Sequence, residues 1–147
     1  FGDIDIRTRE NGSISIHDNV KIDCDCRFVA AREGKIVIGK STNIATGAIF
    51  NGGGDIIIGE NCIFGPRNIL NANEHIFKKE ININQQGFIH KSIKMGNDCW
   101  TGAYVVVSKG VIISDKSVIG ANSFVNKDTE KFSINAGIPS RKIGERE

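Results

Sequence analysis

The sequence is poor in proline and has no long apolar run. Proline occurs 2 times in 147 residues, against 17 glycines, and charged residues make up 24%. No segment approaches the roughly 20 apolar residues of a transmembrane helix, and no signal-peptide pattern is present. We therefore expect one compact domain over residues 1–147, cytoplasmic and without a membrane span. The sequence begins with Phe1 rather than Met, which leaves open whether residues precede it.

A strong charge of either sign is also missing. The formal net charge is only +2 at pH 7. Proteins that bind nucleic acid through phosphate contacts usually show a marked basic excess. We therefore expect no nucleic-acid partner.

A six-residue repeat runs through residues 95–127. The first place is aliphatic in every unit except at Thr101, the second is Gly, Ser or Asn, and the fifth is small or valine. A helix would need an apolar period near 3.6, and a half-buried strand a period of 2. A six-residue period instead favours an all-β, prism-shaped parallel β-helix, in which three units form one coil and the large apolar residue points inward.

The same period organises the first half of the chain. Its apolar first places form three coils: Ile16, Ile22 and Phe28; Ile38, Ile44 and Phe50; Ile58, Phe64 and Leu70. The register breaks at residues 33–35 and at residues 51–55, where a glycine run predicts a tight turn. Cysteine at the fifth place (Cys26, Cys62 and Cys99) is expected to pack as a small buried hydrophobe. We favour structural thiols over a metal site or disulfides, also for Cys24.

Two segments depart from the repeat. Residues 71–93 show no six-residue pattern and contain His75 and His90, two of the three histidines. A long excursion from a compact repeat is commonly functional, so we expect a loop that protrudes and covers a neighbouring surface. After residue 129 we expect a last strand over 132–136, a turn at 137–139, and a short helix over residues 140–147 that caps the open end.

Three runs carry a resemblance to a known family. They read Gly96-Asn-Asp-Cys-Trp100-Thr-Gly102-Ala, then Val111 to Asp128, then Ala136-Gly137-Ile-Pro139-Ser-Arg141. With them the chain resembles the hexapeptide-repeat acyltransferases, and most closely the galactoside, maltose and surface-polysaccharide O-acetyltransferases. The resemblance implies a left-handed β-helix, an exception to the right-handed rule for parallel crossovers. It also implies acetyl-CoA as co-substrate and a sugar hydroxyl as acceptor.

The resemblance implies a catalytic role for His75. Members of the family carry a histidine in the interrupting loop, ahead of the Gly-x-x-x-Trp-x-Gly motif, and His75 holds that place. An imidazole suits a general base because its ordinary pKa lies near neutrality. We expect direct transfer, since no residue resembles an activated nucleophile. A trihistidine zinc site is not expected, because His17, His75 and His90 are scattered along the sequence.

Further site residues follow from the same resemblance. The positions that would contact acetyl-CoA are Trp100, Ala103, Gly120, Ala121, Lys127 and Arg141. Among these, the Ala103 amide would face the thioester carbonyl, and Lys127 and Arg141 would meet phosphates. Asn51, Asp55, Glu74 and His90 are weaker candidates for acceptor contacts. Glu74 or Asn71 could instead orient the His75 ring.

The resemblance also implies a homotrimer with its active sites between subunits. Phe64, Phe77, Phe88 and Tyr104 support this, because they exceed the aromatic surface that one thin prism is expected to bury. Two alternatives remain open. One is an N-acetyltransferase acting on an amino sugar, or an antibiotic acetyltransferase. The other is a non-catalytic β-helix that serves as a binding or assembly module.

Overall fold

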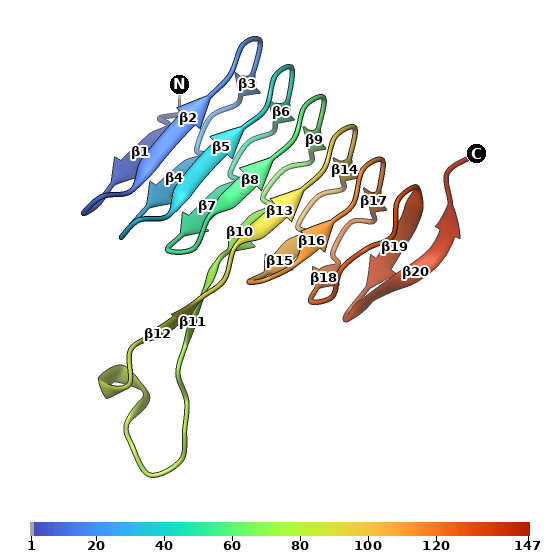
Figure 1. Cartoon of the computed structure of the whole chain (residues 1–147). Coiled ribbons are helices and arrows are strands. Elements are labelled where there is room, and N and C mark those ends of the chain that lie inside the picture. The colour runs from blue at the N-terminus through green and yellow to red at the C-terminus, as the bar shows by residue number, and fades with distance from the viewer. Residues whose placement is uncertain (1) are drawn as a thin grey trace.

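The computed structural model describes residues 2–147 as a stack of coils that forms a three-sided prism (Figure 1). Face A contains β1 (Asp5–Thr8), β4 (Arg27–Ala30), β7 (Ile49–Gly52), β10 (Ile69–Asn71), β15 (Val106–Ser108) and β18 (Phe124–Val125). Face B contains β2 (Ser13–Ile16), β5 (Lys35–Ile38), β8 (Ile56–Ile58), β13 (Ile93–Met95) and β16 (Ile112–Ile113). Face C contains β3 (Lys21–Ile22), β6 (Asn43–Ile44), β9 (Ile63–Phe64), β14 (Trp100–Thr101), β17 (Val118–Ile119), β19 (Ser133–Gly137) and β20 (Ser140–Glu145). The fold is the predicted left-handed parallel β-helix.

The six-residue period sets the register of every face. On face B, Ile16 pairs with Ile38, Ile38 with Ile58, and the column continues through Met95 and Ile113. The face C column starts from Ile22, and the face A column runs from Ile6 through Phe28; both follow the predicted coils in the same way. Most inward residues are almost fully buried, because each one packs between the corresponding residues of the coils above and below, whereas Ile16 at the N-terminal end of its column is 42% exposed.

Aromatic rings fill the middle of the prism. The ring centroids of Phe28 and Phe50 lie 5.1 Å apart at 68°, and those of Phe50 and Phe64 lie 5.4 Å apart. Edge-to-face contacts of this kind add to the apolar burial. Phe64 is 2% exposed, so the prediction that it contributes surface for association is wrong. It is at the first place of its unit, which points inward.

Where the second place of a unit is glycine, the next coil passes close by. A side-chain carbon on Gly59 would lie 2.6 Å from the carbonyl oxygen of Gly96. The corners themselves use left-handed backbone, as at Asn61 (φ 58°) and Lys116 (φ 61°). Asparagine tolerates this conformation better than most residues.

The cysteines are free and mostly buried, as expected. Cys26, Cys62 and Cys99 are each 0–1% exposed, and Cys24 is partly exposed. A hydrogen bond with Cys99, together with burial, raises the pKa of the Cys62 thiol. Cys62 is therefore a protonated packing group at neutral pH. Within residues 2–147, no cluster of three or more His, Cys, Asp or Glu side chains is arranged to hold a metal ion.

The C-terminal segment corrects one prediction. Residues 140–145 form strand β20, which pairs antiparallel with β19, and not the predicted helix. The predicted last strand and the turn at residues 137–139 are confirmed. The turn folds residues 140–145 back onto β19. The backbone N–H and C=O groups of this charged segment then pair with the free edge of β19. This pairing outweighs the local helix preference of a mixed-charge sequence.

The described part of the chain has little helix. Its single helical turn is the short 3₁₀ segment η1 (Ile83–Gln85). Of the helices that residues 2–147 form, none combines the length and the apolar character of a membrane span.

Candidate active site

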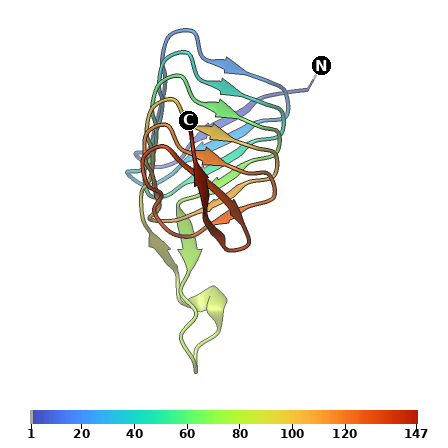
Figure 2. The same cartoon turned by 90° about the vertical axis from the view of Figure 1, so that its right-hand side faces the viewer.

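A two-stranded arm interrupts the coil stack between β10 and β13. It consists of β11 (Asn73–His75) and β12 (Phe88–His90), which pair antiparallel, and an outer loop that includes η1. The predicted protruding segment is thereby confirmed, and Figures 1 and 2 show it projecting from one edge of the prism. Gln86 orders the outer loop: the Lys78 N–H donates to its side-chain oxygen at 2.7 Å, and its amide donates to the Ile81 carbonyl at 2.7 Å.

One face of the arm carries a row of rings. His75 lies opposite Phe88 in the ladder, and Asn73 lies opposite His90. Residues two apart on a strand share a face, so all four side chains point the same way. The ring centroids of His75 and Phe88 lie 4.2 Å apart, and those of Phe88 and His90 lie 6.1 Å apart. The cross-strand partner therefore holds the His75 imidazole through stacking.

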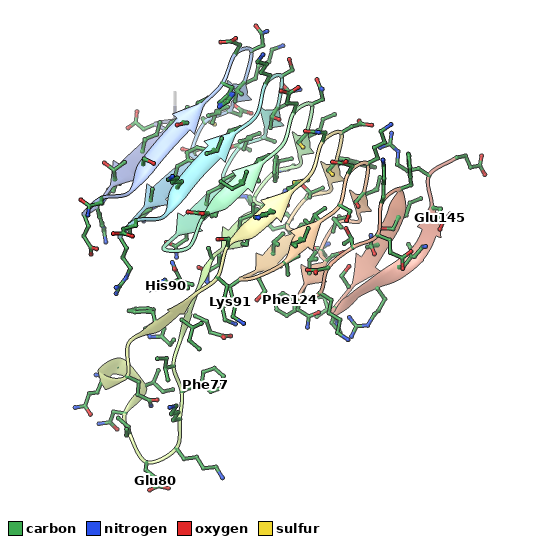
Figure 3. All side chains as sticks on the ribbon, viewed as in Figure 1. Phe77, Glu80, His90, Lys91, Phe124 and Glu145 are labelled. Carbon is green, nitrogen blue, oxygen red and sulfur yellow. The ribbon has the colours of Figure 1, made fainter. Side chains whose placement is uncertain are left out.

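An open groove of about 560 Å³ lies where the arm leaves face A. Its lining residues come from the arm and from β7, β10, β15 and β18: Asn51, Asn71, Asn73, Glu74, His75, Phe77, Ile83, Phe88, Val106, Val107, Ser108 and Phe124. Figure 3 shows Phe77 on the arm and Phe124 on the coil stack, on the two sides of this region. The groove combines apolar walls with amide and imidazole groups, which suits a small polar substrate.

Two of the four acceptor candidates, Asn51 and Glu74, line the groove together with His75. Asp55 does not: its carboxylate accepts the Lys35 N–H at 2.9 Å, and it lines a separate polar cavity beside Arg32. His90 is not among the lining residues either. On geometric grounds, Asn51 and Glu74 remain candidates for acceptor contacts, whereas Asp55 and His90 do not.

Glu74 is tied up by an ion pair. Its carboxylate contacts the ammonium group of Lys109, whose side chain is only 17% exposed. Within residues 2–147, no hydrogen bond joins Glu74 to the His75 ring, and none joins Asn71 to it. Both candidates for an orienting partner thus point elsewhere, and stacking on Phe88 takes that role.

The polar floor of the groove is a ladder of asparagines. The Asn51 side-chain amide donates to the Asn71 side-chain oxygen at 3.0 Å, on adjacent strands of face A. Ser108 lies next to Asn71 in the following coil. Asn73, Phe88 and Ser108 also line the groove, although they were not predicted as site residues. For Ser108 the signal was in the register, since it falls one place after the inward Val107, as Asn71 does after Leu70. Asn73 and Phe88 lie outside the repeat, which gives no such signal.

The residues implied for acetyl-CoA lie on another part of the prism. Trp100 is 52% exposed on face C. Ala103 follows Trp100 at the corner between faces C and A. The next coil passes close to this corner: a side-chain carbon on Gly102 would lie 2.6 Å from the backbone nitrogen of Ala121. Within residues 2–147, the Ala103 N–H donates to no backbone acceptor. A free amide at a small-residue corner is what a thioester carbonyl would need.

Lys127 and Arg141 lie together near the C-terminal hairpin. They line a small cavity of about 110 Å³ with Ser140. The Ser140 hydroxyl is buried and has no hydrogen-bond partner among residues 2–147. Arg141 donates to the Ser140 carbonyl at 2.6 Å, which fixes its position. Lys142, Asp128 and Glu130 line the same cavity, and Lys142 is paired with Glu130. Lys127 and Arg141 therefore bring positive charge to a cavity of mixed charge.

The Ala103 corner does not line the His75 groove of its own chain. Ala103 precedes β15, whereas Ser108, which lines the groove, ends it. Val106, at the start of the same strand, also lines the groove, three residues after Ala103. None of the six residues implied for acetyl-CoA is itself among the lining residues of the groove.

The coil stack and the arm with its histidine define a left-handed β-helix protein of the hexapeptide-repeat kind. Residues 92–127 match the bacterial transferase hexapeptide (six repeats) family. The chain is 32% identical over 140 residues to the dTDP-4-amino-4,6-dideoxy-D-glucose acyltransferase of Escherichia coli, a match that covers 91% of this chain and 72% of that protein. The chain belongs to the hexapeptide-repeat acyltransferase family, as the resemblance predicted.

Other relatives agree with this assignment. The chain is 38% identical over 90 residues to the galactoside O-acetyltransferase of Escherichia coli (strain K12), covering 61% of this chain and 44% of that protein, less than half of its length. The crystal structure of the polySia-specific acetyltransferase NeuO superposes with a TM-score of 0.84 at 30% identity, covering 97% of this chain and 61% of that one. A galactoside acetyltransferase in complex with coenzyme A gives 0.76 at 29% identity, covering 90% and 64%.

Proposed function

We propose that the protein is an acetyl-CoA-dependent O-acetyltransferase that acts on a sugar hydroxyl, with His75 as its general base. The observation that carries the proposal is the position of His75, stacked on Phe88 in a groove with a polar asparagine floor. The galactoside O-acetyltransferase relative and the coenzyme A complex of a galactoside acetyltransferase support this choice of substrates.

The proposed reaction is a direct transfer. A nitrogen of the neutral His75 ring takes the proton from the acceptor hydroxyl as the oxygen attacks the thioester carbonyl carbon. The Ala103 N–H donates to the oxyanion that forms. The carbon–sulfur bond then breaks, the leaving thiolate of coenzyme A takes the proton from the His75 ring, and the acetylated sugar is released. Lys127 and Arg141 would hold phosphate groups of the co-substrate.

None of the residues implied for acetyl-CoA lines the His75 groove of its own chain, which supports a homotrimer with shared active sites. His75 of one subunit would meet Trp100 and Ala103 of its neighbour. Apolar residues exposed on the outside of faces A and C, including Ile49, Ile63 and Phe124, supply surface for such contacts. Mixing a His75→Ala protein with a Trp100→Ala protein after subunit exchange should restore part of the activity. A stable, active monomer in sedimentation would contradict the shared site.

The general-base role can be tested by replacing His75 with alanine. We expect turnover, measured as release of coenzyme A, to fall by about 10²–10⁴-fold. His17→Ala is the matched control, because His17 is exposed in the first coils, far from the groove, and should keep full turnover. Unchanged turnover in His75→Ala would rule out the proposed base. A wild-type protein that releases no coenzyme A with any acceptor would instead favour a non-catalytic module.

A second candidate is transfer to an amino sugar nitrogen. It is favoured by the 32% identical relative, an acyltransferase named for an amino sugar nucleotide, whose match covers 91% of this chain. Mass spectrometry of a panel of neutral and amino sugars after incubation with acetyl-CoA distinguishes the two. An alkali-labile ester indicates O-transfer, whereas an alkali-stable amide indicates N-transfer.

A further inference from the structure

His90 and Asn73 form a hydrogen-bonded pair at the root of the arm. The His90 Nδ1 and the Asn73 Oδ1 are 2.6 Å apart, and the two residues face each other across β11 and β12. Figure 3 shows His90 where the arm meets the coil stack, with Phe77 farther out. Resting on the proposed function, we propose that His90 is a positioning residue: its bond to Asn73 fixes the root of the arm and thereby the place of His75.

The amide orientation defines which atom carries the proton. The Asn73 Nδ2 donates to the Asn51 carbonyl at 3.4 Å, which turns Oδ1 towards His90. The His90 Nδ1 therefore carries the hydrogen and donates it. The Nε2 atom is buried and has no partner among residues 2–147. A protonated ring would bury a second donor without an acceptor, so the neutral ring is favoured.

Charged neighbours act on the same ring. Burial lowers the pKa of His90, and the nearby Arg32 lowers it further, while Glu10 opposes them. The pair thus keeps its neutral form at physiological pH. A ring held in one tautomer gives the arm a fixed hydrogen bond at its base.

The coil stack is shaped to receive the pair. Gly53 lies beside it at the corner that follows β7, and a side-chain carbon there would lie 2.5 Å from the His90 Nδ1 and would also collide with the Asn73 Oδ1. Only glycine lets the root of the arm lie this close to the backbone of the coil. The Asn73 bond to Asn51 then ties the pair to the asparagine floor of the groove.

The connection from this pair to His75 is short. Asn73 and His75 are two residues apart on β11 and share a face, and His90 stands in the same relation to Phe88 on β12. The stack of His75 on Phe88 thus follows directly from the His90–Asn73 pair along both strands. Loss of the pair would loosen both rings together, whereas the buried coils would remain in place.

Two kinds of measurement, hydrogen exchange and enzyme kinetics, test the proposal. In the ligand-free protein, His90→Ala and Asn73→Ala should each speed amide hydrogen exchange in β11 and β12 by about tenfold, with no change in the coil strands. In the assay, His90→Ala should lower kcat about tenfold and leave KM for acetyl-CoA within about twofold. His90→Asn keeps a donor near the Nδ1 position and should recover most of both losses.

Controls and outcomes separate the pair from other effects. Ile89→Ala, on the opposite face of the same strand, should change neither exchange nor kcat, and the double variant Asn73→Ala/His90→Ala should be no worse than either single one. Unchanged arm exchange in His90→Ala, or no recovery in His90→Asn, would overturn the proposal. The hydrogen-exchange measurement needs no acceptor. Its result therefore remains interpretable even if His75→Ala keeps its turnover and the proposed function fails.

Discussion

The coil stack and the arm differ in how their strands pair and in how far their apolar side chains are buried. In the coils each strand pairs in register with the corresponding strand of the next coil, and most inward apolar side chains are buried inside the prism. In the arm, two three-residue strands pair antiparallel, and Phe77 (66%) and Ile81 (54%) remain exposed. The coils bury the apolar core and the arm carries the proposed general base, so we expect each region to respond to different substitutions.

The sharpest way to break this comparison is to remove one phenylalanine from each region. Phe50→Ala should lower the free energy of unfolding by about 3–5 kcal/mol, because Phe50 is fully buried between two other rings. Phe88→Ala should cost less than about 1 kcal/mol, because Phe88 is 46% exposed, yet it should impair turnover. Chemical denaturation and coenzyme A release measure the two effects. Equal destabilisation by both variants would contradict the division.

A shortened arm should have the next largest effect. Replacing residues 76–87 by Asn-Gly joins His75 and Phe88, which already face each other, through a two-residue turn. We expect the melting temperature to stay within a few degrees, while kcat/KM for the acceptor falls about 10–100-fold because Phe77 and Ile83 leave the groove. Thermal melts and acceptor kinetics are the measurements. A large drop in melting temperature would show that the outer loop also stabilises the coils.

A smaller effect is expected at the far end of the coil stack. Arg141→Ala should raise KM for acetyl-CoA about five- to tenfold and change kcat little, because it removes a cation from the proposed phosphate site without touching the His75 groove. Lys40→Ala, another exposed cation, serves as the control. A loss confined to kcat would place Arg141 in the reaction step and not in phosphate binding.

The smallest predicted effect is a pH dependence of stability. Since the folded protein lowers the pKa of His90, the unfolded chain binds the proton more readily. The stabilisation of the folded protein by the neutral His90 is therefore fully present above the ordinary histidine pKa near 6.5. It is lost as the pH falls through the lower pKa that His90 has in the folded protein. Denaturation midpoints of wild type and His90→Asn, measured from pH 7.5 to 5, should differ in slope. Identical slopes would contradict the shifted pKa.

The sequence predicted the coils better than the site for a physical reason. One apolar residue in six is a local signal, so the columns through Ile16, Ile22 and Phe28 were predicted in the correct register. The C-terminal strand β20 was missed because its partner β19 determines it, and composition alone favoured a helix.

The arm shows where such prediction stops. Its position and His75 followed from the break in the repeat and from the resemblance. That His75 stacks on Phe88, and that Asn73 meets His90, depends on how the outer loop closes, which no short pattern specifies. The role of His75 itself remains a prediction that the alanine variant tests.

The pairing of each coil with the next has a consequence for how such proteins diverge. Because the columns constrain only an inward residue and its small neighbours, most outward positions are free to drift without cost to the architecture. A backbone match of 0.84 at 30% identity to NeuO is the expected outcome of that freedom. The β-helix therefore tolerates changes in its surface charge and in its inserted arm, while the architecture of the coils stays the same.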